Sequence, residues 1–474
     1  MKKTRLLMII LSAFLLAAMG YVLFRYVHDV NTEGGWWMNR SANFRLEKTR
    51  AKVTEGSILD SAGIVLAESF APGERHYIED KAIRFAMSHT IGDTEGQCQN
   101  GVEARRATEL LGLSDRAKSY HDLQLLIGNN PTGCDLKLTV SAELSTYMAS
   151  LFPAGHNGAA VLLNYRTGAI LGKVSLPGFD IADVDPLNDE NRGYSYFDKV
   201  LSEQKAPGST FKIVVLASAL ENLDGIEDET FTCDGSWTIS DYSIRCAGGT
   251  SHGEMDLREA FAQSCNVTFS TIAYRLGAAR LKATAEKFGF NRQYSFSEFA
   301  LQPSRCLLTQ TSGETLQAGI GQGETDTTPL HMALISGAIA NGGVMMEPKI
   351  VREVCAHGGS ALSVMEPSIC DTICDPDTAY KLATYMYSVV DSGTGTRAKI
   401  SGYKGGKICG KTGSAEFGTA KDGSTHAWYT GFIYGDDEHP YAIAIVVEGG
   451  GSGGSVAAPM ASKIMAKAIS LGLK

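Results

Sequence analysis

The spacing of apolar and polar residues predicts a layered α+β fold in the second half of the chain. Short apolar runs bounded by turn residues predict strands at 159–163, 169–174, 405–411, 426–434 and 441–447. Helical periodicity occupies 209–222, 255–263, 267–276, 328–341 and 457–470. Strands at both ends with helices between them predict a five-stranded antiparallel sheet flanked by helices, with a helical subdomain inserted.

A smaller α+β domain is expected before this region. Residues 53–70 read as two short strands around a turn at Ser61-Ala62-Gly63, and residues 80–130 are mostly helical in pattern. The pattern changes near residue 155. We therefore expect a membrane-proximal domain over 25–155, called the pedestal below, and a larger domain over 156–474.

The N-terminus carries one long apolar segment. Leu6 to Phe24 is nineteen residues without a charge, which is enough to cross a bilayer as a helix. Lys2, Lys3 and Arg5 precede it, so the positive-inside rule predicts a cytoplasmic tail over 1–5 and an extracytoplasmic remainder. A cleaved signal peptide is the alternative, but the run outlasts a typical signal core and no small-x-small site follows it. We expect an uncleaved single-pass anchor over 6–24.

Composition narrows the class of protein. The chain has 474 residues, of which 44% are hydrophobic and 20% charged, as in a globular protein of two or three domains. The net charge of −9 gives no support for a nucleic-acid partner.

Ten cysteines in an exported chain can pair or stay as free thiols. Cys233 and Cys246 flank a strand-like stretch and are one candidate disulfide, and Cys370 and Cys374 are another. No Cys-x-x-Cys pair or histidine cluster has the usual spacing of a zinc site, so no metal is expected.

The first chemical motif is Ser209-x-x-Lys212, at the start of an apolar helical stretch. Three residues apart on a helix, the two side chains share a face. A serine hydroxyl becomes a good nucleophile when a neighbour takes its proton. A lysine can do so if burial or a nearby cation lowers its pKa. The simpler interpretation is a helix cap followed by a surface lysine.

The second motif is Ser264-Cys265-Asn266, between two helical stretches. Ser264 could relay a proton beside a Ser–Lys pair, and the Asn266 amide could hold a substrate carbonyl or amide. A helix cap is the simpler interpretation of this tripeptide.

The third motif is Lys411-Thr412-Gly413-Ser414, which admits two interpretations. With Gly405 it satisfies the pattern of a phosphate-binding loop, which requires a long helix directly after it. The following residues contain Gly418, Gly423 and alternating aromatic positions, which predict a turn and a strand instead. On a strand, Gly413 leaves room for a ligand backbone to approach.

Together the three motifs resemble those of the penicillin-binding proteins, in which S-x-x-K, S-x-N and K-T-G occur in this order. Other stretches of the sequence resemble those of the class B penicillin-binding proteins. They are EGSILDSAGIVLAES, NYRTGAILGKVSLPGFD, APGSTFK, the stretch 321–343, GKTGSAE and AWYTGF. The resemblance covers most of residues 53–474. Three departures are Glu55 where arginine is usual, Ser414 where threonine is commoner, and Cys265 at the variable middle position.

The resemblance implies a role for each motif residue in a peptidoglycan D,D-transpeptidase. Ser209 would attack the penultimate D-Ala of a stem peptide, Lys212 would take its proton, and Ser264 with Lys411 would help D-Ala to leave. The remaining implied roles belong to Asn266, Thr412, Gly413 and Ser414, which would bind the stem peptide. The backbone N–H groups of Ser209 and Ser414 would form the oxyanion hole, and Gly321 to Gly323 would abut the active-site helix. β-Lactams would acylate Ser209, and no cofactor is implied.

Other functions remain open beside this one. A D,D-carboxypeptidase, a class D-like β-lactamase and a β-lactam sensor share the serine acyl-enzyme, and a non-catalytic scaffold of a cell-wall synthesis complex is a different class. The short pedestal leaves little room for a glycosyltransferase domain, so the resemblance implies a polytopic membrane glycosyltransferase as partner. Roles in cell shape, cell division and sporulation fit equally.

Overall fold

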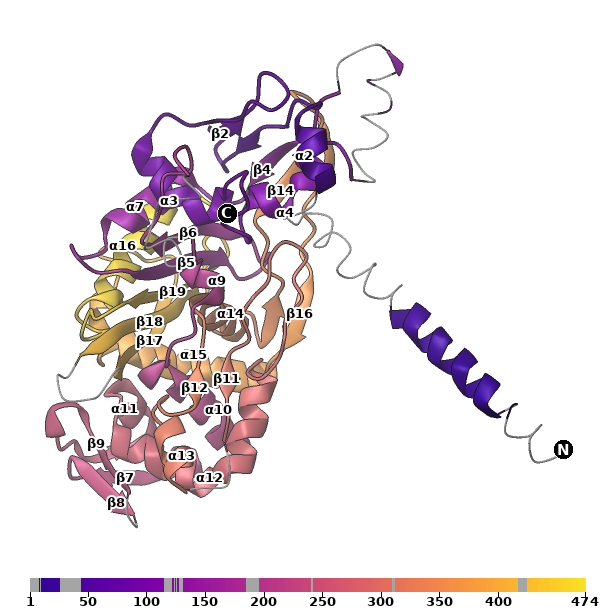
Figure 1. Cartoon of the computed structure of the whole chain (residues 1–474). Helices are drawn as coiled ribbons and strands as arrows, with labels where there is room; N and C mark the ends of the chain where they lie inside the picture. The colour runs from indigo at the N-terminus through magenta and orange to yellow at the C-terminus, as the bar shows by residue number, and fades with distance from the viewer. Residues whose placement is uncertain are drawn as a thin grey trace.

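The structure is a computed structural model of the chain (Figure 1). It describes residues 8, 10–25, 44–114, 122, 124, 126–127, 131–184, 196–239, 242–308, 312–416 and 424–474.

The largest element is a five-stranded antiparallel sheet of order β17-β18-β19-β5-β6. Its strands are β5 (Gly158–Asn164), β6 (Ile170–Leu176), β17 (Lys407–Glu416), β18 (Thr425–Tyr434) and β19 (Tyr441–Val447). The predicted sheet is thus confirmed, including the pairing of the N-terminal strand β5 with the C-terminal strand β19, in which Val161 lies opposite Ala444.

Both faces of this sheet are buried because successive side chains point to opposite sides. Along β5, Val161 and Leu163 belong to one hydrophobic core, and Ala160 and Leu162 belong to the other. Helix α14 (Pro329–Ala340) packs on the first face, and α16 (Ala457–Ser470) and α7 (Ala142–Ser150) cover the second.

The inserted helical region adjoins the β17 end of the sheet (Figure 1). Its helices are α10 (Lys212–Asn222), α11 (Leu257–Ala262), α12 (Asn266–Lys287), α13 (Ser312–Ala318) and α15 (Pro376–Asp391). Two small hairpins lie beside them, made by β7 (Thr230–Cys233) with β10 (Gly253–Asp256) and by β8 (Ser236–Ile239) with β9 (Tyr242–Arg245).

The pedestal contains a second sheet that sequence analysis did not predict. It is mixed and six-stranded, of order β15-β14-β4-β1-β2-β3. The pedestal supplies β1 (Ile58–Leu59), β2 (Val65–Glu68), β3 (His76–Tyr77) and β4 (Asp135–Leu138), whereas β14 (Val351–Cys355) and β15 (Ala361–Val364) come from the second half of the chain. The predicted strands around Ser61 to Gly63 are confirmed as β1 and β2. Strand β14, which pairs with β4, was missed because this pairing joins residues more than 200 positions apart.

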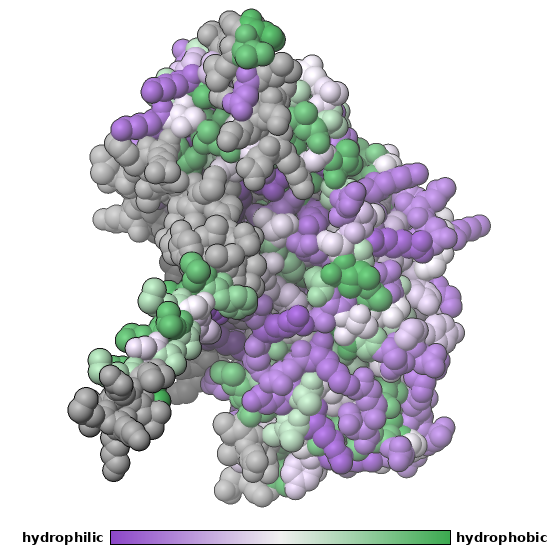
Figure 2. All heavy atoms as spheres, turned by 90° about the vertical axis from the view of Figure 1, so that its right-hand side faces the viewer, coloured by the Kyte–Doolittle hydropathy of each residue, from purple (hydrophilic) through white to green (hydrophobic). Residues whose placement is uncertain are grey.

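The apolar N-terminal segment is helical where the structure describes it, at Met8 and from Ile10 to Arg25. Its apolar side chains are exposed, and Figure 2 shows them in green and pale green. None of the helices in the described residues combines the length and apolar character needed to cross a membrane. The predicted anchor over 6–24 is therefore not confirmed, and Leu6, Leu7 and Ile9 lie outside the described residues.

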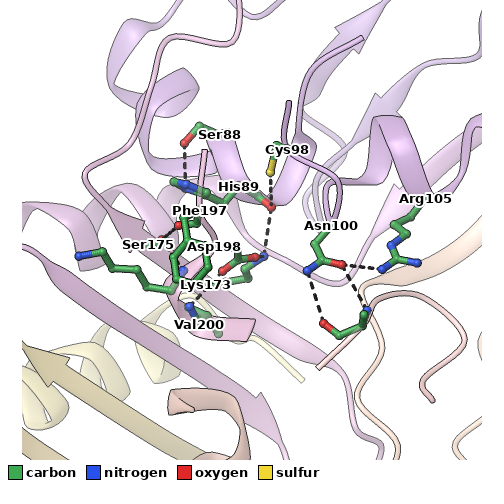
Figure 3. Close-up of polar contacts among 12 residues, drawn as sticks. Ser88, His89, Cys98, Asn100, Arg105, Lys173, Ser175, Phe197, Asp198 and Val200 are labelled. Atoms are coloured by element: carbon green, nitrogen blue, oxygen red, sulfur yellow. Dashed lines mark hydrogen bonds and ion pairs between the residues drawn. The ribbon is translucent and has the colours of Figure 1, made fainter. Parts of the chain in front are cut away.

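A buried ion pair of the larger domain is hydrogen-bonded to the pedestal (Figure 3). Lys173 on β6 and Asp198, the N-cap of α9 (Lys199–Ser202), are 2.5 Å apart, and both side chains are at most 2% exposed. The Lys173 amine also donates to the carbonyl of His89, on the pedestal helix α3 (Lys81–Ile91), at 3.1 Å. The Lys173 amine therefore links β6, α9 and α3.

Replacing Lys173 with methionine is expected to destabilise the protein strongly. Asp198 would keep a buried charge without its partner, a change that costs about 3–5 kcal/mol of the free energy of unfolding. Denaturant unfolding of the full chain in detergent would measure it. The matched control is Lys137→Met, because Lys137 pairs with Glu353 at the surface and its loss should barely change stability. Equal effects of the two substitutions would contradict the importance assigned to the buried pair.

Candidate active site

Ser209 and Lys212 lie on one tight turn at the start of α10. Gly208 to Phe211 form a 3₁₀ turn, and the N–H of Lys212 donates to the carbonyl of Ser209. Side chains three residues apart eclipse each other on such a turn, so Ser209 and Lys212 share a face. Ser209 is partly exposed, and its hydroxyl makes no hydrogen bond with any residue in the described part of the chain. It can therefore meet a ligand.

Glycines let the backbone of this turn approach two other segments. Gly208 has φ +55°, and a Cβ there would lie 2.9 Å from the carbonyl oxygen of Ser414 on β17. A Cβ on Gly413 would lie 2.9 Å from the carbonyl oxygen of Pro207. The Gly208 N–H donates to the carbonyl of Gly321 at 2.9 Å. The turn is thus held between β17 and the predicted Gly321 segment, and the space beside Gly413 is filled by the chain itself.

Two buried lysines converge on the hydroxyl of Ser264. The amine of Lys212 lies 3.3 Å from Ser264 Oγ, and the amine of Lys411 lies 2.8 Å from the same atom. Lys212 also donates to the carbonyl of Ser264 at 2.7 Å and to Asn266 Oδ1 at 2.8 Å. The structure therefore brings four predicted site residues together around one hydroxyl.

Burial lowers the pKa of both lysine amines. Desolvation lowers the pKa of Lys212 from its ordinary value to about 7. The pKa of Lys411 also falls well below its ordinary value, first through desolvation and then through the nearby Lys212. Both side chains are fully buried, and the rings of Phe269 and Phe261 lie 5.5 Å from the two amines. Near neutral pH, a neutral amine that can accept a proton is available beside Ser264.

The strand β17 presents the remaining predicted residues. Thr412 Oγ1 lies 2.7 Å from Thr394 Oγ1, and Ser414 is exposed on the same strand. Thr394 follows α15, and sequence analysis did not single it out because Ser-Gly-Thr-Gly-Thr reads as an ordinary turn. The phosphate-loop interpretation of this segment is excluded, because Lys411 to Ser414 lie inside a strand that pairs with β18.

A second cluster, the Cys–His cluster, lies directly beside the Ser264 loop. It contains Cys233, Cys246, His252 and Cys265, whose potential ligand atoms all lie within 4.8 Å of one another. All ten cysteines are free thiols, and the Sγ atoms of Cys233 and Cys246 are 3.6 Å apart. The predicted disulfides are therefore absent.

The cluster offers three cysteines and one histidine, which are residue types that bind zinc, although the sequence shows no zinc-site spacing. The ligands come from separate strands, helix ends and loops at intervals that no simple motif contains. Hydrogen bonding with Cys265, and with the backbone N–H groups of Val267 and Asn266, lowers the pKa of the Cys246 thiol.

Residues 158–466 match the family described as the penicillin binding protein transpeptidase domain. The peptidoglycan D,D-transpeptidase PbpA of Mycolicibacterium smegmatis is 28% identical over 402 residues, which cover 79% of this chain and 80% of that protein. Stage V sporulation protein D of Bacillus subtilis is 30% identical over 462 residues, which cover 89% of this chain and 68% of that protein.

Solved structures give a similar result. The ceftriaxone acyl-enzyme complex of penicillin-binding protein A from M. tuberculosis superposes with a TM-score of 0.78 at 25% identity, covering 90% of this chain and all of that one. A D,D-transpeptidase domain from Eggerthella lenta has a TM-score of 0.76 at 28% identity, covering 89% of this chain and 99% of that one.

Adding a methyl group at Gly321 should disrupt the turn that carries Ser209. The Cβ of Gly321→Ala would lie 2.0 Å from the carbonyl oxygen of Gly208, and φ at this position is +69°. The control is Gly342→Ala, where φ is +65° and no atom lies within 4 Å. Both variants carry left-handed strain of roughly 1–2 kcal/mol, and Gly321→Ala should lose about 4 kcal/mol or more in total. Thermal unfolding would compare them, and equal losses would show that the turn tolerates the contact.

Proposed function

This chain belongs to the penicillin-binding protein transpeptidase family, and from that premise we propose that it is a peptidoglycan D,D-transpeptidase acting through a serine acyl-enzyme. The observation that carries the proposal is the pair of buried amines of Lys212 and Lys411 around the Ser264 hydroxyl, next to the Ser209 turn. Relatives of similar length are also named peptidoglycan D,D-transpeptidases.

Acylation begins when Ser209 Oγ attacks the carbonyl carbon of the penultimate D-Ala. The Oγ–C bond forms as the neutral amine of Lys212 takes the hydroxyl proton. The C–N bond then breaks, and the leaving amine of D-Ala receives a proton through Ser264. The hydrogen bonds of Ser264 to both lysines supply this relay at 3.3 and 2.8 Å.

The second half of the reaction returns the proton along the same path. The amine of a neighbouring stem peptide attacks the acyl carbon, and its proton passes to the lysine pair. The C–Oγ bond then breaks as the cross-link forms, and Ser209 Oγ takes a proton back from Lys212. The N–H groups of Ser209 and Ser414 stabilise the oxyanion, at about 3 kcal/mol per donor in comparable enzymes.

The substrate is held from two sides of the site. Asn266 binds the stem peptide near the scissile amide, and its amide is fixed by Lys212 and by the carbonyl of Arg245. The hydroxyls of Thr412 and Ser414 bind the terminal carboxylate, with Thr394 orienting Thr412. Gly413 contributes its backbone, since its Cβ side is occupied.

The location of the enzyme follows from its N-terminal segment. Residues 6–24 form a single-pass membrane anchor with the N-terminus in the cytoplasm, supported by the uncharged run and by Lys2, Lys3 and Arg5 before it. The catalytic domain is extracytoplasmic, where it meets stem peptides and β-lactams. A polytopic membrane glycosyltransferase that contacts the anchor and the pedestal supplies the glycan strands.

Substituting Ser209 with alanine is expected to abolish both acylation and transfer. The full chain in detergent would be given a fluorescent penicillin and, separately, a stem-peptide thioester with a D-amino acid as acceptor. The wild type should be labelled and should form the exchange product, because the acyl group passes through Ser209 Oγ. Ser462→Ala on α16 is the matched control, and it should retain both activities.

Two outcomes would contradict the proposed function in different ways. Labelling that survives in Ser209→Ala would place the nucleophile elsewhere. Hydrolysis of the thioester without exchange product would instead indicate a carboxypeptidase or β-lactamase.

Acylation should depend on pH through Lys212. Below pH 7 this lysine is mostly protonated and cannot accept the serine proton, so the rate constant of penicillin acylation should rise as pH passes 7 and then level off. Lys212→Arg keeps a positive charge throughout and should be inactive. The exposed Lys407 on β17 gives the control, since Lys407→Arg should retain the wild-type profile. A rate that does not change between pH 5 and 9 would exclude Lys212 as the base.

A further inference from the structure

Three distances between ligand atoms of the Cys–His cluster match those of a tetrahedral zinc site, and all four ligand atoms lie within 4.8 Å of one another. Zinc binds thiolate sulfur at about 2.3 Å and imidazole nitrogen at about 2.0–2.1 Å, which places two sulfurs about 3.8 Å apart and a sulfur and a nitrogen about 3.5 Å apart. The observed distances are 3.6 Å from Cys233 Sγ to Cys246 Sγ, 3.8 Å from Cys246 Sγ to Cys265 Sγ, and 3.4 Å from Cys233 Sγ to His252 Nδ1. A disulfide would need about 2.05 Å.

The surroundings of the sulfurs also fit bound thiolates. The three cysteines are at most 4% exposed, so only hydrogen bonds from the protein or a bound metal ion can stabilise thiolates there. The N–H of Gly235 donates to Cys233 Sγ at 3.4 Å, and the N–H and hydroxyl of Thr268 donate to Cys265 Sγ at 3.4 and 3.3 Å. Such outer hydrogen bonds orient metal ligands and stabilise their charge.

We propose that Cys233, Cys246, His252 and Cys265 bind one Zn²⁺ ion and that this ion fixes the loop that carries Ser264 and Asn266. Three sulfurs and one nitrogen in a closed tetrahedron select zinc among the common divalent ions and leave no open position for catalysis. The role is therefore structural, and the ion takes no part in bond making or breaking.

The path from the ion to the active site is short. Cys265 is the residue between Ser264 and Asn266, and it caps α12. Ser264 has φ +57°, an unfavourable left-handed conformation for a serine, so its loop needs to be held from both sides. Lys212 holds the carbonyl of Ser264, and the ion would hold the next residue against the hairpins that carry Cys233 and Cys246. Asn266 Nδ2 is bonded to the same hairpin region at the carbonyl of Arg245, at 2.8 Å.

Metal content of the full chain tests the site directly. Elemental analysis after purification with added ZnCl₂ should give one zinc per wild-type chain and per Cys374→Ala, a buried cysteine outside the cluster. The Cys233→Ala and Cys246→Ala variants should lose it. Zinc-edge X-ray absorption of the wild type should show three sulfurs and one nitrogen at about 2.3 and 2.0 Å. This measurement decides the question even if the variants fail to fold.

A second measurement tests the positioning role. Wild-type protein stripped by a chelator would be compared with zinc-reloaded protein at a temperature at which circular dichroism shows both folded. The rate constant of penicillin acylation should be about a hundredfold lower without zinc, the loss that a shift of about 1 Å in a catalytic group can cause. Reloading should restore it.

Three results would overturn the proposal. They are a wild-type chain that binds no zinc, a zinc shell without the three sulfurs, and a folded stripped protein that is acylated at the full rate. The first two leave the proposed transpeptidase intact, since they concern the metal alone. Absent acylation in reloaded protein that holds its zinc would instead contradict the proposed function.

Discussion

Two amines buried around one hydroxyl are the constraint on which the catalytic arrangement depends. Lys212 and Lys411 cannot both carry a full charge within reach of Ser264 and away from water, so burial forces at least one of them toward its neutral form. The apolar core around the two lysines therefore contributes to catalysis, because it favours the neutral amine that can accept a proton. The apolar residues of α10 and the rings of Phe261 and Phe269 exclude the water that would otherwise keep a lysine protonated.

The position of the two lysines also depends on three segments that are distant in the sequence and pack closely together. The turn at Gly208, the strand at Gly413 and the segment at Gly321 approach at backbone distance, where a single methyl group would not fit. Side chains cannot adjust to absorb such a contact. The glycines thus allow these three segments to pack into one rigid site.

Much of this arrangement could be predicted from the sequence, because local pattern determines strands, helices and motif spacing. The five strands of the main sheet and the closeness of Ser209 to Lys212 follow from periodicity. The pairing of β14 with β4, the contact of Thr394 with Thr412 and the Cys–His cluster could not be predicted. Each depends on tertiary packing that brings together residues with no shared local pattern. Two of the cluster's four members flank a hairpin, which made them a candidate disulfide in the sequence.

The mixed sheet of the pedestal contains strands from both halves of the chain, so the two halves form a single cooperative unit. Strands β14 and β15 leave the larger domain and complete a sheet begun by residues 58–138. A protein cut near residue 155 would expose the edge of β14, with unpaired N–H and C=O groups ready to join another chain. Recombination could therefore not exchange the pedestal as an independent unit, and a force applied to the pedestal would reach the catalytic half through continuous backbone hydrogen bonds.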